Sequence, residues 1–254
     1  MVKVFLDPGH GGSDPGALGD GLKEKDINLS VALKVGSILI NHSINVNYSR
    51  TTDVFVELAD RAKKANSYNA DIFVSLHCNA FDNPSAKGVE TYSYPNSTNG
   101  AKLARALQNS IISSGVYTAD RGTKTANFAV LRLTNMPAAL VEMGFITNTE
   151  DANILKNKQN ELAIAIAKGI LSYFGIPYKG TTTLYKVQVG AFKVKSNADN
   201  MAKELKDKGY EAIVIYQDGF YKVQVGAFKD RLNAEALAKQ LKSQGYDAII
   251  VVVN

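Results

Sequence analysis

Cysteine is almost absent from this sequence, which has one thiol, Cys78, among 254 residues. A single cysteine forms no disulfide within the chain and supplies no CxxC zinc site, so any metal ion must be held by histidine and carboxylate side chains. Long apolar runs are also missing, since none approaches the ~20 residues that a membrane span needs. The composition, with 45% hydrophobic and 21% charged residues, is otherwise that of a globular protein and excludes collagen-like, low-complexity and wholly disordered chains.

The sequence has no strong excess of one charge. Its 29 Lys and Arg residues against 24 Asp and Glu residues leave a net charge of +5, without the dense basic stripe that is typical of nucleic-acid-binding proteins. A mild positive excess favours contact with an anionic polymer but identifies no partner. We therefore expect no nucleic-acid partner.

The N-terminus lacks the basic, apolar and small-residue regions of a secretory signal. An alternating run at residues 2–6 leads directly into the segment Asp7-Pro8-Gly9-His10. We expect synthesis in the cytoplasm, without a signal peptide in this chain.

An internal repeat occupies the C-terminal part. The nine residues 185–193 recur letter for letter at 221–229, and the longer alignment of 185–217 with 221–253 has 19 identities in 33 positions. Each copy contains an alternating strand, a polar helix that ends at Gly-Tyr, and a β-branched run. Two such β-α-β copies predict a small α+β domain of ferredoxin-like βαββαβ order, with both helices on one face of a four-stranded antiparallel sheet.

The Gly-, Pro- and Thr-rich segment 176–183 is typical of a linker. It divides the chain into a first domain, 1–175, and a second, 184–254. In the first domain the apolar pattern predicts strands at 2–6, 44–49, 71–77, 88–94, 128–133 and 138–142. It predicts helices at 25–40, 54–68, 98–114, 148–155 and 159–174. This alternation indicates an α/β fold, a twisted and mostly parallel sheet flanked by helices on both faces.

Four polar residues occupy positions where such a sheet binds ligands, outside the carboxyl ends of its strands. His10 follows the first strand, His77 and Glu142 end two other strands, and Glu24 opens the helix after a Gly-rich loop. Two histidines and two glutamates suit a catalytic zinc site, in which three side chains hold the metal and a further carboxylate serves as general base. Each residue also has a plainer interpretation, because a strand-end histidine can be an ordinary polar residue and Glu24 can stabilise the helix dipole.

The combination resembles a known family. From residue 2 to 175 the sequence is similar to the zinc-dependent N-acetylmuramoyl-L-alanine amidases of bacterial cell-wall hydrolases (amidase type 3), including sporulation autolysins that lyse the mother cell and phage endolysins. The motifs that carry the resemblance are Asp7-Pro8-Gly9-His10-Gly11-Gly12, Leu22-Lys23-Glu24-Lys25, Ser49-Arg50-Thr51, Ser75-Leu76-His77-Cys78-Asn79-Ala80 and Val141-Glu142-Met143-Gly144-Phe145.

The resemblance implies that His10, Glu24 and His77 bind one Zn²⁺ per chain and that Glu142 is the catalytic glutamate. The implied reaction is hydrolysis of the amide between N-acetylmuramic acid and L-Ala of the peptidoglycan stem peptide, which lyses the bacterial cell wall. Asn79 is a candidate substrate-binding residue, because it faces the same way as His77 two positions along the strand.

Several neighbours have structural interpretations. We expect Arg50 and Arg61 to pair with core carboxylates, and His42 to face solvent in a turn. We expect Asp7 and Asp14 to hold the Gly-rich loop by turn hydrogen bonds.

The repeat resembles the SPOR domain, a family that binds peptidoglycan glycan from which stem peptides have been removed. Val187 and Val189 are expected to face the helices, which leaves Gln188 and its repeat partner Gln224 on the open face of the sheet as candidate glycan-binding residues. The same residues also suit a merely solvated polar face. We expect no RNA binding, another use of this fold, because the central strands lack the stacking aromatics of RNA-recognition modules.

The sequence thus favours a two-domain peptidoglycan amidase that acts at the bacterial cell wall, as an autolysin or as a phage endolysin. Two alternatives remain open at this point. A zinc carboxypeptidase or endopeptidase acting on the stem peptide would use a similar set of side chains, and a wall-binding regulator would bind without catalysis.

Overall fold

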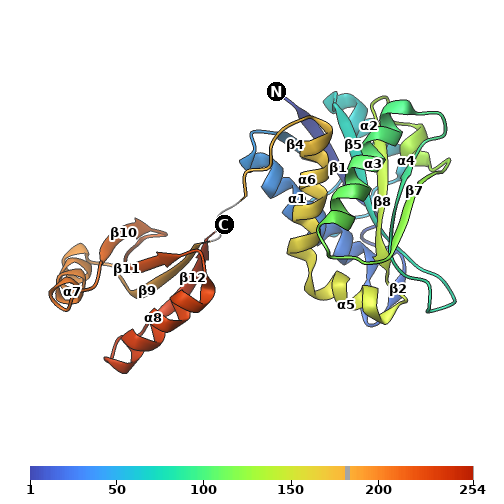
Figure 1. Cartoon of the computed structure of the whole chain (residues 1–254). Helices are drawn as coiled ribbons and strands as arrows, with labels where there is room; N and C mark the ends of the chain where they lie inside the picture. The colour runs from blue at the N-terminus through green and yellow to red at the C-terminus, as the bar shows by residue number, and fades with distance from the viewer. Residues whose placement is uncertain (181–183, 254) are drawn as a thin grey trace. The chain divides into compact units, whose positions relative to one another are not determined.

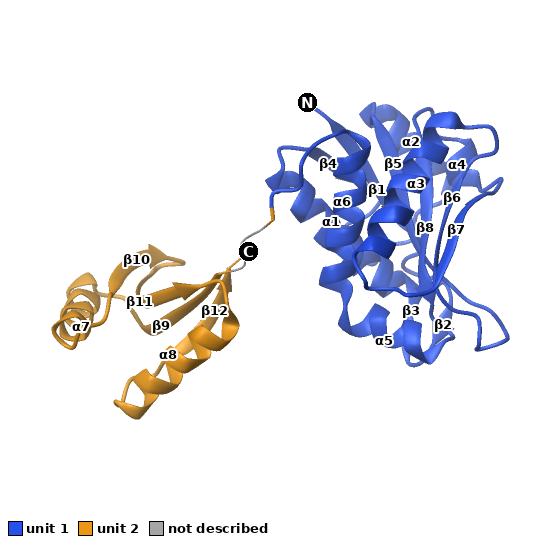
Figure 2. Ribbon diagram, viewed as in Figure 1, with its two compact units in different colours: residues 1–179 blue, residues 180–254 orange. Residues whose placement is uncertain are grey.

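The computed structural model describes residues 1–180 and 184–253. The chain divides into two compact units, residues 1–179 and 180–254 (Figure 2). No helix among the described residues is long and apolar enough to cross a membrane.

The first unit is built on a six-stranded sheet (Figure 1). The strands are ordered β4 (Asn45–Tyr48), β1 (Lys3–Pro8), β5 (Ile72–Asn79), β8 (Ala138–Phe145), β6 (Val89–Ser93) and β7 (Asp120–Thr125). All neighbours run parallel except β6 and β8, which are antiparallel. A short hairpin, β2 (Leu18–Gly19) and β3 (Leu22–Lys23), precedes the first helix.

Helices cover both faces of this sheet. Alternating side chains of β1 enter two separate cores, with Val4 and Leu6 on one face and Phe5 on the other. The larger core packs against α1 (Glu24–Asn41), α3 (Thr98–Ser113) and α6 (Gln159–Tyr173). The smaller core packs against α2 (Leu58–Tyr68) and α4 (Ala129–Arg132). A further helix, α5 (Thr149–Asn157), follows β8.

The second unit has the order β9 (Leu184–Phe192), α7 (Lys195–Asp207), β10 (Ile213–Gln217), β11 (Phe220–Phe228), α8 (Arg231–Ser243) and β12 (Ile249–Val253). Its antiparallel sheet is ordered β10-β11-β9-β12, and its core joins Val187, Val189 and their repeat partners to the apolar sides of α7 and α8. The fold class predicted from the sequence, a mostly parallel α/β sheet and a ferredoxin-like α+β domain, is confirmed.

Three local predictions in the first unit were wrong. Residues 128–133 contain the short helix α4 rather than a strand, because so short an apolar run fits either structure. The edge strand β7 was missed because its residues, Asp-Arg-Gly-Thr-Lys-Thr, carry no apolar alternation. The helix expected at 54–68 begins at Leu58.

A buried ion pair joins the strands on the α2 side of the sheet. Asp7 and Arg61, which are 0% and 2% exposed, lie 2.8 Å apart between Oδ1 and Nη1. The Asp7 carboxylate also accepts hydrogen bonds from Ser49 Oγ at 2.6 Å and Ser75 Oγ at 2.8 Å. The pair therefore connects β1, β5 and α2 with the residue that follows β4.

Replacing Arg61 by Leu leaves the Asp7 charge buried without its cation. We expect the Arg61→Leu variant to lose about 3–5 kcal/mol of unfolding free energy, measured by urea denaturation. The matched control is Arg105→Leu on the exposed side of α3, which should change stability by no more than about 0.5 kcal/mol. A loss below about 1 kcal/mol for Arg61→Leu would contradict this role of the pair.

Candidate metal centre

His10 lies in the loop after β1, in a backbone conformation that is uncommon for residues other than glycine, with a φ of 59°. Two interactions hold it there. Arg61 Nη2 donates to the His10 carbonyl at 2.8 Å, and the imidazole Nδ1 lies 2.7 Å from Asp14 Oδ2. The Asp14 contact leaves the other ring nitrogen, Nε2, directed toward Glu24.

Glu24 is the first residue of α1, where a carboxylate is favoured by the helix dipole. Its side chain is 4% exposed. Oε2 accepts the backbone N–H of Ala17 at 2.8 Å, and Oε1 accepts the backbone N–H of Cys78 at 3.0 Å and Asn28 Nδ2 at 3.2 Å. The carboxylate is thus held from three sides.

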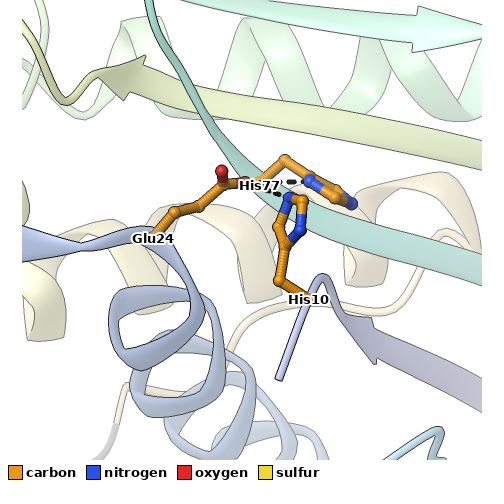
Figure 3. A group of neighbouring side chains, drawn as sticks. All are labelled: His10, Glu24 and His77. Carbon is orange, nitrogen blue, oxygen red and sulfur yellow. Dashed lines mark hydrogen bonds and ion pairs between the residues drawn. The ribbon is translucent and has the colours of Figure 1, made fainter. Parts of the chain in front are cut away.

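His77 completes the cluster from β5 (Figure 3). Its Nδ1 lies 2.9 Å from Glu24 Oε1, and His10 Nε2 lies 3.2 Å from the same oxygen. The two rings meet edge to face, with centroids 4.9 Å apart. One ligand atom from each residue lies within 4.8 Å of the others.

Two glycines allow this close approach. A Cβ at Gly9 would lie 2.2 Å from the His77 ring, and a Cβ at Gly16 would lie 2.6 Å from Glu24 Oε2 and 2.7 Å from His10 Cδ2. The Gly-rich loop therefore lacks side chains where the imidazoles and the carboxylate pack against its backbone.

The contacts among His10, Glu24 and His77 also shift the pKa values of these side chains. Burial opposes a charged His10, but hydrogen bonds and charges from Glu24 and Asp14 outweigh it and raise the His10 pKa to about 9. Burial also opposes a charged Glu24, yet the two imidazoles hold the pKa of this carboxyl well below its usual range. The pKa of His77 is raised against the effect of burial, chiefly by its hydrogen bond to Glu24.

The three side chains fit a zinc ion. Two imidazole nitrogens and a carboxylate oxygen converge, and the Nε2–Oε1 and Nδ1–Oε1 separations of 3.2 and 2.9 Å are close to the roughly 3.3 Å expected between ligands of a tetrahedral site with zinc bonds near 2.0–2.1 Å. The Asp14 carboxylate on the second nitrogen of His10 is the usual outer partner of a metal-binding histidine.

Glu142 lies beside this cluster on β8, opposite His77 in the strand register. Burial, together with the nearby carboxylates Glu24 and Glu90, raises the pKa of Glu142 to about 7, against the effect of His77. Its Oε2 is buried and has no hydrogen-bond partner among the described residues. In the metal-free protein, the carboxyl group of Glu142 therefore takes up or releases a proton near neutral pH.

A cavity of about 480 Å³ connects these groups. His10, His77 and Glu142 line it together with apolar side chains, among them Phe55, Leu58 and Phe128 to Val130. A larger and more open hollow of about 910 Å³ beside β4 and α2 is lined by none of the cluster residues or Glu142, so we place the chemistry in the smaller cavity.

The neighbouring residues differ in part from expectation. Asn79 Nδ2 donates to Glu90 Oε1 at 2.9 Å. Arg61 pairs with a core carboxylate as expected, whereas Arg50 donates to backbone carbonyls, among them those of Pro8 and Gly9 at 3.0 and 2.9 Å, and to no carboxylate among the described residues.

Two further expectations were wrong. His42 is half-buried, not solvent-facing, because its ring stacks on Tyr178 and its Nε2 accepts the backbone N–H of Lys179 at 2.8 Å. Asp7 holds Arg61 and two serines rather than a turn. Asp14 does form the expected turn bond, to Gly16 N–H at 3.0 Å, in addition to its contact with His10.

Sequence reasoning missed a charged group beside Glu142. Glu90, 2% exposed on β6, accepts hydrogen bonds from Arg121 and Lys124 on β7. A carboxylate inside the apolar strand predicted at 88–94 was the available signal, because a buried charge requires a partner. Its partners, Arg121 and Lys124, lie on β7, the strand that the apolar pattern did not predict.

In the second unit, Gln188 and Gln224 lie opposite each other on the two central strands. Both are half-buried, while Val187 and Val223 are buried on the helix side. The two amides therefore share the open face of the sheet.

Comparisons with known proteins match the two units to two families. The N-acetylmuramoyl-L-alanine amidase family matches residues 4–172, and the SPOR domain matches residues 181–252. The chain is 45% identical over 222 residues to the sporulation-specific N-acetylmuramoyl-L-alanine amidase of Bacillus subtilis, and the match covers 86% of each chain. It is 42% identical over 186 residues to an endolysin of Bacillus phage SPP1, with 69% of this chain and 67% of the endolysin covered.

Solved structures of amidases are similar to this chain over more than two thirds of its length. An N-acetylmuramoyl-L-alanine amidase from Clostridium difficile 630 superposes with a TM-score of 0.65 at 43% identity, over 69% of this chain and 97% of that one. The amidase AmiC2 of Nostoc punctiforme gives a TM-score of 0.65 at 42% identity, over 68% and 97% of the two chains.

The close contact at Gly9 provides a test of the cluster without removing a ligand atom. A methyl group in Gly9→Ala must displace the His77 ring, so we expect zinc affinity to fall at least about tenfold, because metal sites depend on the orientation of their ligands. Competition with a chromophoric chelator measures the affinity, and thermal melting shows whether the variant is folded. Wild-type affinity in a folded Gly9→Ala protein would show that His77 does not bind the metal from this position.

Proposed function

The chain belongs to the N-acetylmuramoyl-L-alanine amidase family and carries a SPOR domain, and from this premise we propose that it cleaves peptidoglycan with one zinc ion per chain, held by His10, Glu24 and His77. The bond cleaved is the amide between N-acetylmuramic acid and L-Ala of the stem peptide. The observation that carries this proposal is that two imidazoles face one oxygen of Glu24, with the carboxyl of Glu142 beside them in one cavity.

A zinc ion in this position would polarise the amide carbonyl and lower the pKa of a bound water. The protein itself holds the proposed metal ligands in position. Asp14 orients His10, Glu24 is fixed by backbone N–H groups, and the glycines let the rings approach. Little rearrangement is therefore needed when the metal binds.

Glu142 is the proposed proton carrier. A general base must lie beside the group whose proton it takes, and Glu142 lies opposite His77 in the strand register and lines the same cavity as His10 and His77. Its unpartnered Oε2 is free to accept a proton from the attacking water. The same carboxyl then donates that proton to the amine of L-Ala as the amide bond breaks.

The apolar side chains of the cavity serve substrate binding. Phe55, Leu58 and Phe128 line it beside the polar groups and offer apolar contact area to a substrate.

The SPOR domain and the amidase domain both indicate peptidoglycan as the partner. We propose that the SPOR sheet binds the glycan strand through Gln188 and Gln224, which share its open face. Two binding sites on one chain raise the local concentration of each site at the wall.

We further propose action at the bacterial cell wall as a sporulation autolysin. The sporulation-specific Bacillus subtilis relative matches over 86% of this chain, against 69% for the phage endolysin, and this wider match supports the autolysin role.

The three histidines of the chain allow a controlled test of the metal site. His10→Ala and His77→Ala should each reduce bound zinc from about one equivalent per chain to well below half, because two ligands bind zinc far more weakly than three. His42→Ala removes an imidazole outside the cluster and should keep the full equivalent. Elemental analysis after dialysis gives the zinc content. Retention of one zinc by both cluster variants would refute the proposed ligands.

Product analysis tests the reaction and the role of Glu142 together. The wild-type protein should release stem peptides that begin at L-Ala from purified peptidoglycan, and a chelator should stop the release. Glu142→Gln should keep zinc but lose about 10²–10⁴-fold in rate, because the amide cannot carry the proton. Glu150→Gln, at an exposed glutamate paired with Lys87, should match the wild type.

Mass spectrometry of the products distinguishes the alternatives. Shortened stem peptides still attached to sugar would identify a peptidase. Wall binding without any product from the zinc-loaded protein would identify a non-catalytic regulator.

A further inference from the structure

A cationic cluster, formed by Arg121 and Lys124 around the carboxylate of Glu90, lies next to Glu142. His77 on β5, Glu142 on β8 and Glu90 on β6 lie opposite one another in successive strand registers. On β7 the residues beside Glu90 are 121 and 122, because Val89 pairs with Asp120 and Thr91 pairs with Thr123. Arg121 is therefore next in a row that begins at the proposed metal site and ends at the edge of the sheet.

The cluster has more positive charge than its buried carboxylate requires. Glu90 Oε1 accepts from Asn79 Nδ2 at 2.9 Å and from the Tyr92 hydroxyl at 2.7 Å. Glu90 Oε2 accepts from Arg121 Nε at 2.6 Å and from Lys124 Nζ at 2.5 Å. One carboxylate thus holds two cations, and the three side chains together carry a net positive charge whenever the neighbouring Glu142 carboxyl is protonated.

Arg121 presents an unused pair of donors. Only its Nε donates to Glu90, and Nη1 and Nη2 have no acceptor within residues 1–180 and 184–253. The guanidinium carbon lies 4.8 Å from the centroid of the Phe145 ring, and 37% of the side chain is exposed. A planar guanidinium that contacts Glu90 and Phe145 and keeps two free N–H groups matches the two oxygens of a carboxylate.

The contact with Glu90 does not use the Nη1 and Nη2 groups of Arg121, because Nε alone makes it. One cation balances Glu90, and the second balances Glu142 only while that carboxyl, opposite Glu90, is ionised; when Glu142 holds a proton, the two cations repel each other. The Lys124 side chain is 39% exposed and contacts the same oxygen of Glu90 as Arg121, so both cations reach solvent. A ligand with a negative charge would relieve that repulsion.

The distance between Arg121 and Glu142 can be spanned by a short extended peptide together with the arginine side chain. Arg121 lies two strand spacings from Glu142, or roughly 10 Å between backbones. Two residues of extended peptide span roughly 7 Å, and an arginine side chain covers the remainder. A carboxylate one residue beyond L-Ala therefore falls within reach of Arg121 when the scissile amide lies at Glu142.

We propose that Arg121, assisted by Lys124 and held in place by Glu90, binds the free α-carboxylate of the second stem-peptide residue. This inference rests on the proposed function, because it assumes that the scissile amide lies between the metal cluster and Glu142. It makes the β6–β7 edge the peptide side of the substrate cleft and makes Arg121 a specificity-determining residue.

Two substrates that differ in one group test the proposal. Glycan strands carrying uncrosslinked stem peptides are prepared with the α-carboxyl of the second residue either free, as D-isoglutamate, or amidated, as D-isoglutamine. A paired charge-assisted contact predicts that the wild-type protein cleaves the free acid with a kcat/KM about 10- to 100-fold higher. Arg121→Gln should reduce this preference to about twofold or less, by lowering kcat/KM for the acid much more than for the amide.

Matched variants separate this role from a structural one. Arg105→Gln, at an exposed arginine on α3, should retain the full preference. Lys124→Gln should reduce the preference by a smaller factor, and it serves as the second test if Arg121→Gln melts at a lower temperature. A structural role alone would lower the rates for both substrates by the same factor, and that result would overturn the inference.

The outcomes also separate this inference from the proposed function. Equal cleavage of both substrates by the wild-type protein would overturn the carboxylate site and leave the amidase intact. Failure of the zinc-loaded wild-type protein to cleave either substrate would overturn the proposed function itself.

Discussion

The ion pair between Asp7 and Arg61 is the interaction on which the site depends. The Asp7 carboxylate has no solvent exposure and accepts from Arg61, from Ser75 on β5 and from Ser49 just after β4, so it fixes β1 relative to its neighbours. The same guanidinium donates to the carbonyls of Pro8 and His10 at 2.7 and 2.8 Å. One buried cation therefore sets both the strand packing and the backbone of the loop that carries His10.

The positions of His10, Glu24 and His77 follow from the geometry of the strands and of this loop. Parallel strands bring the ends of β1 and β5 to the same edge of the sheet, and α1 begins there with Glu24. Glycine at positions 9 and 16 leaves room for the two rings and the carboxylate. The chain thus combines a rigid sheet with a loop of small residues, and this combination holds two imidazoles against a single oxygen atom.

Most of this arrangement could be predicted from the sequence. Alternating apolar residues predicted β1, and the buried strands β5 and β8 followed from uninterrupted apolar runs. The His10, Glu24, His77 and Glu142 motifs predicted which side chains meet. The β7 strand could not be predicted, because its charged residues pair with Glu90 rather than forming an apolar face. For the same reason the hydrogen bond from the Asn79 amide to Glu90 could not be predicted, because spacing along one strand does not reveal a partner on another strand.

X-ray absorption at the zinc edge of the zinc-loaded protein tests the central claim most directly. The account predicts two imidazole nitrogens and one carboxylate oxygen at about 2.0–2.2 Å from the metal, and one imidazole fewer around the zinc that His10→Ala or His77→Ala retains at saturating zinc. An unchanged spectrum in both variants, or a first shell without imidazole, would contradict the proposed metal centre.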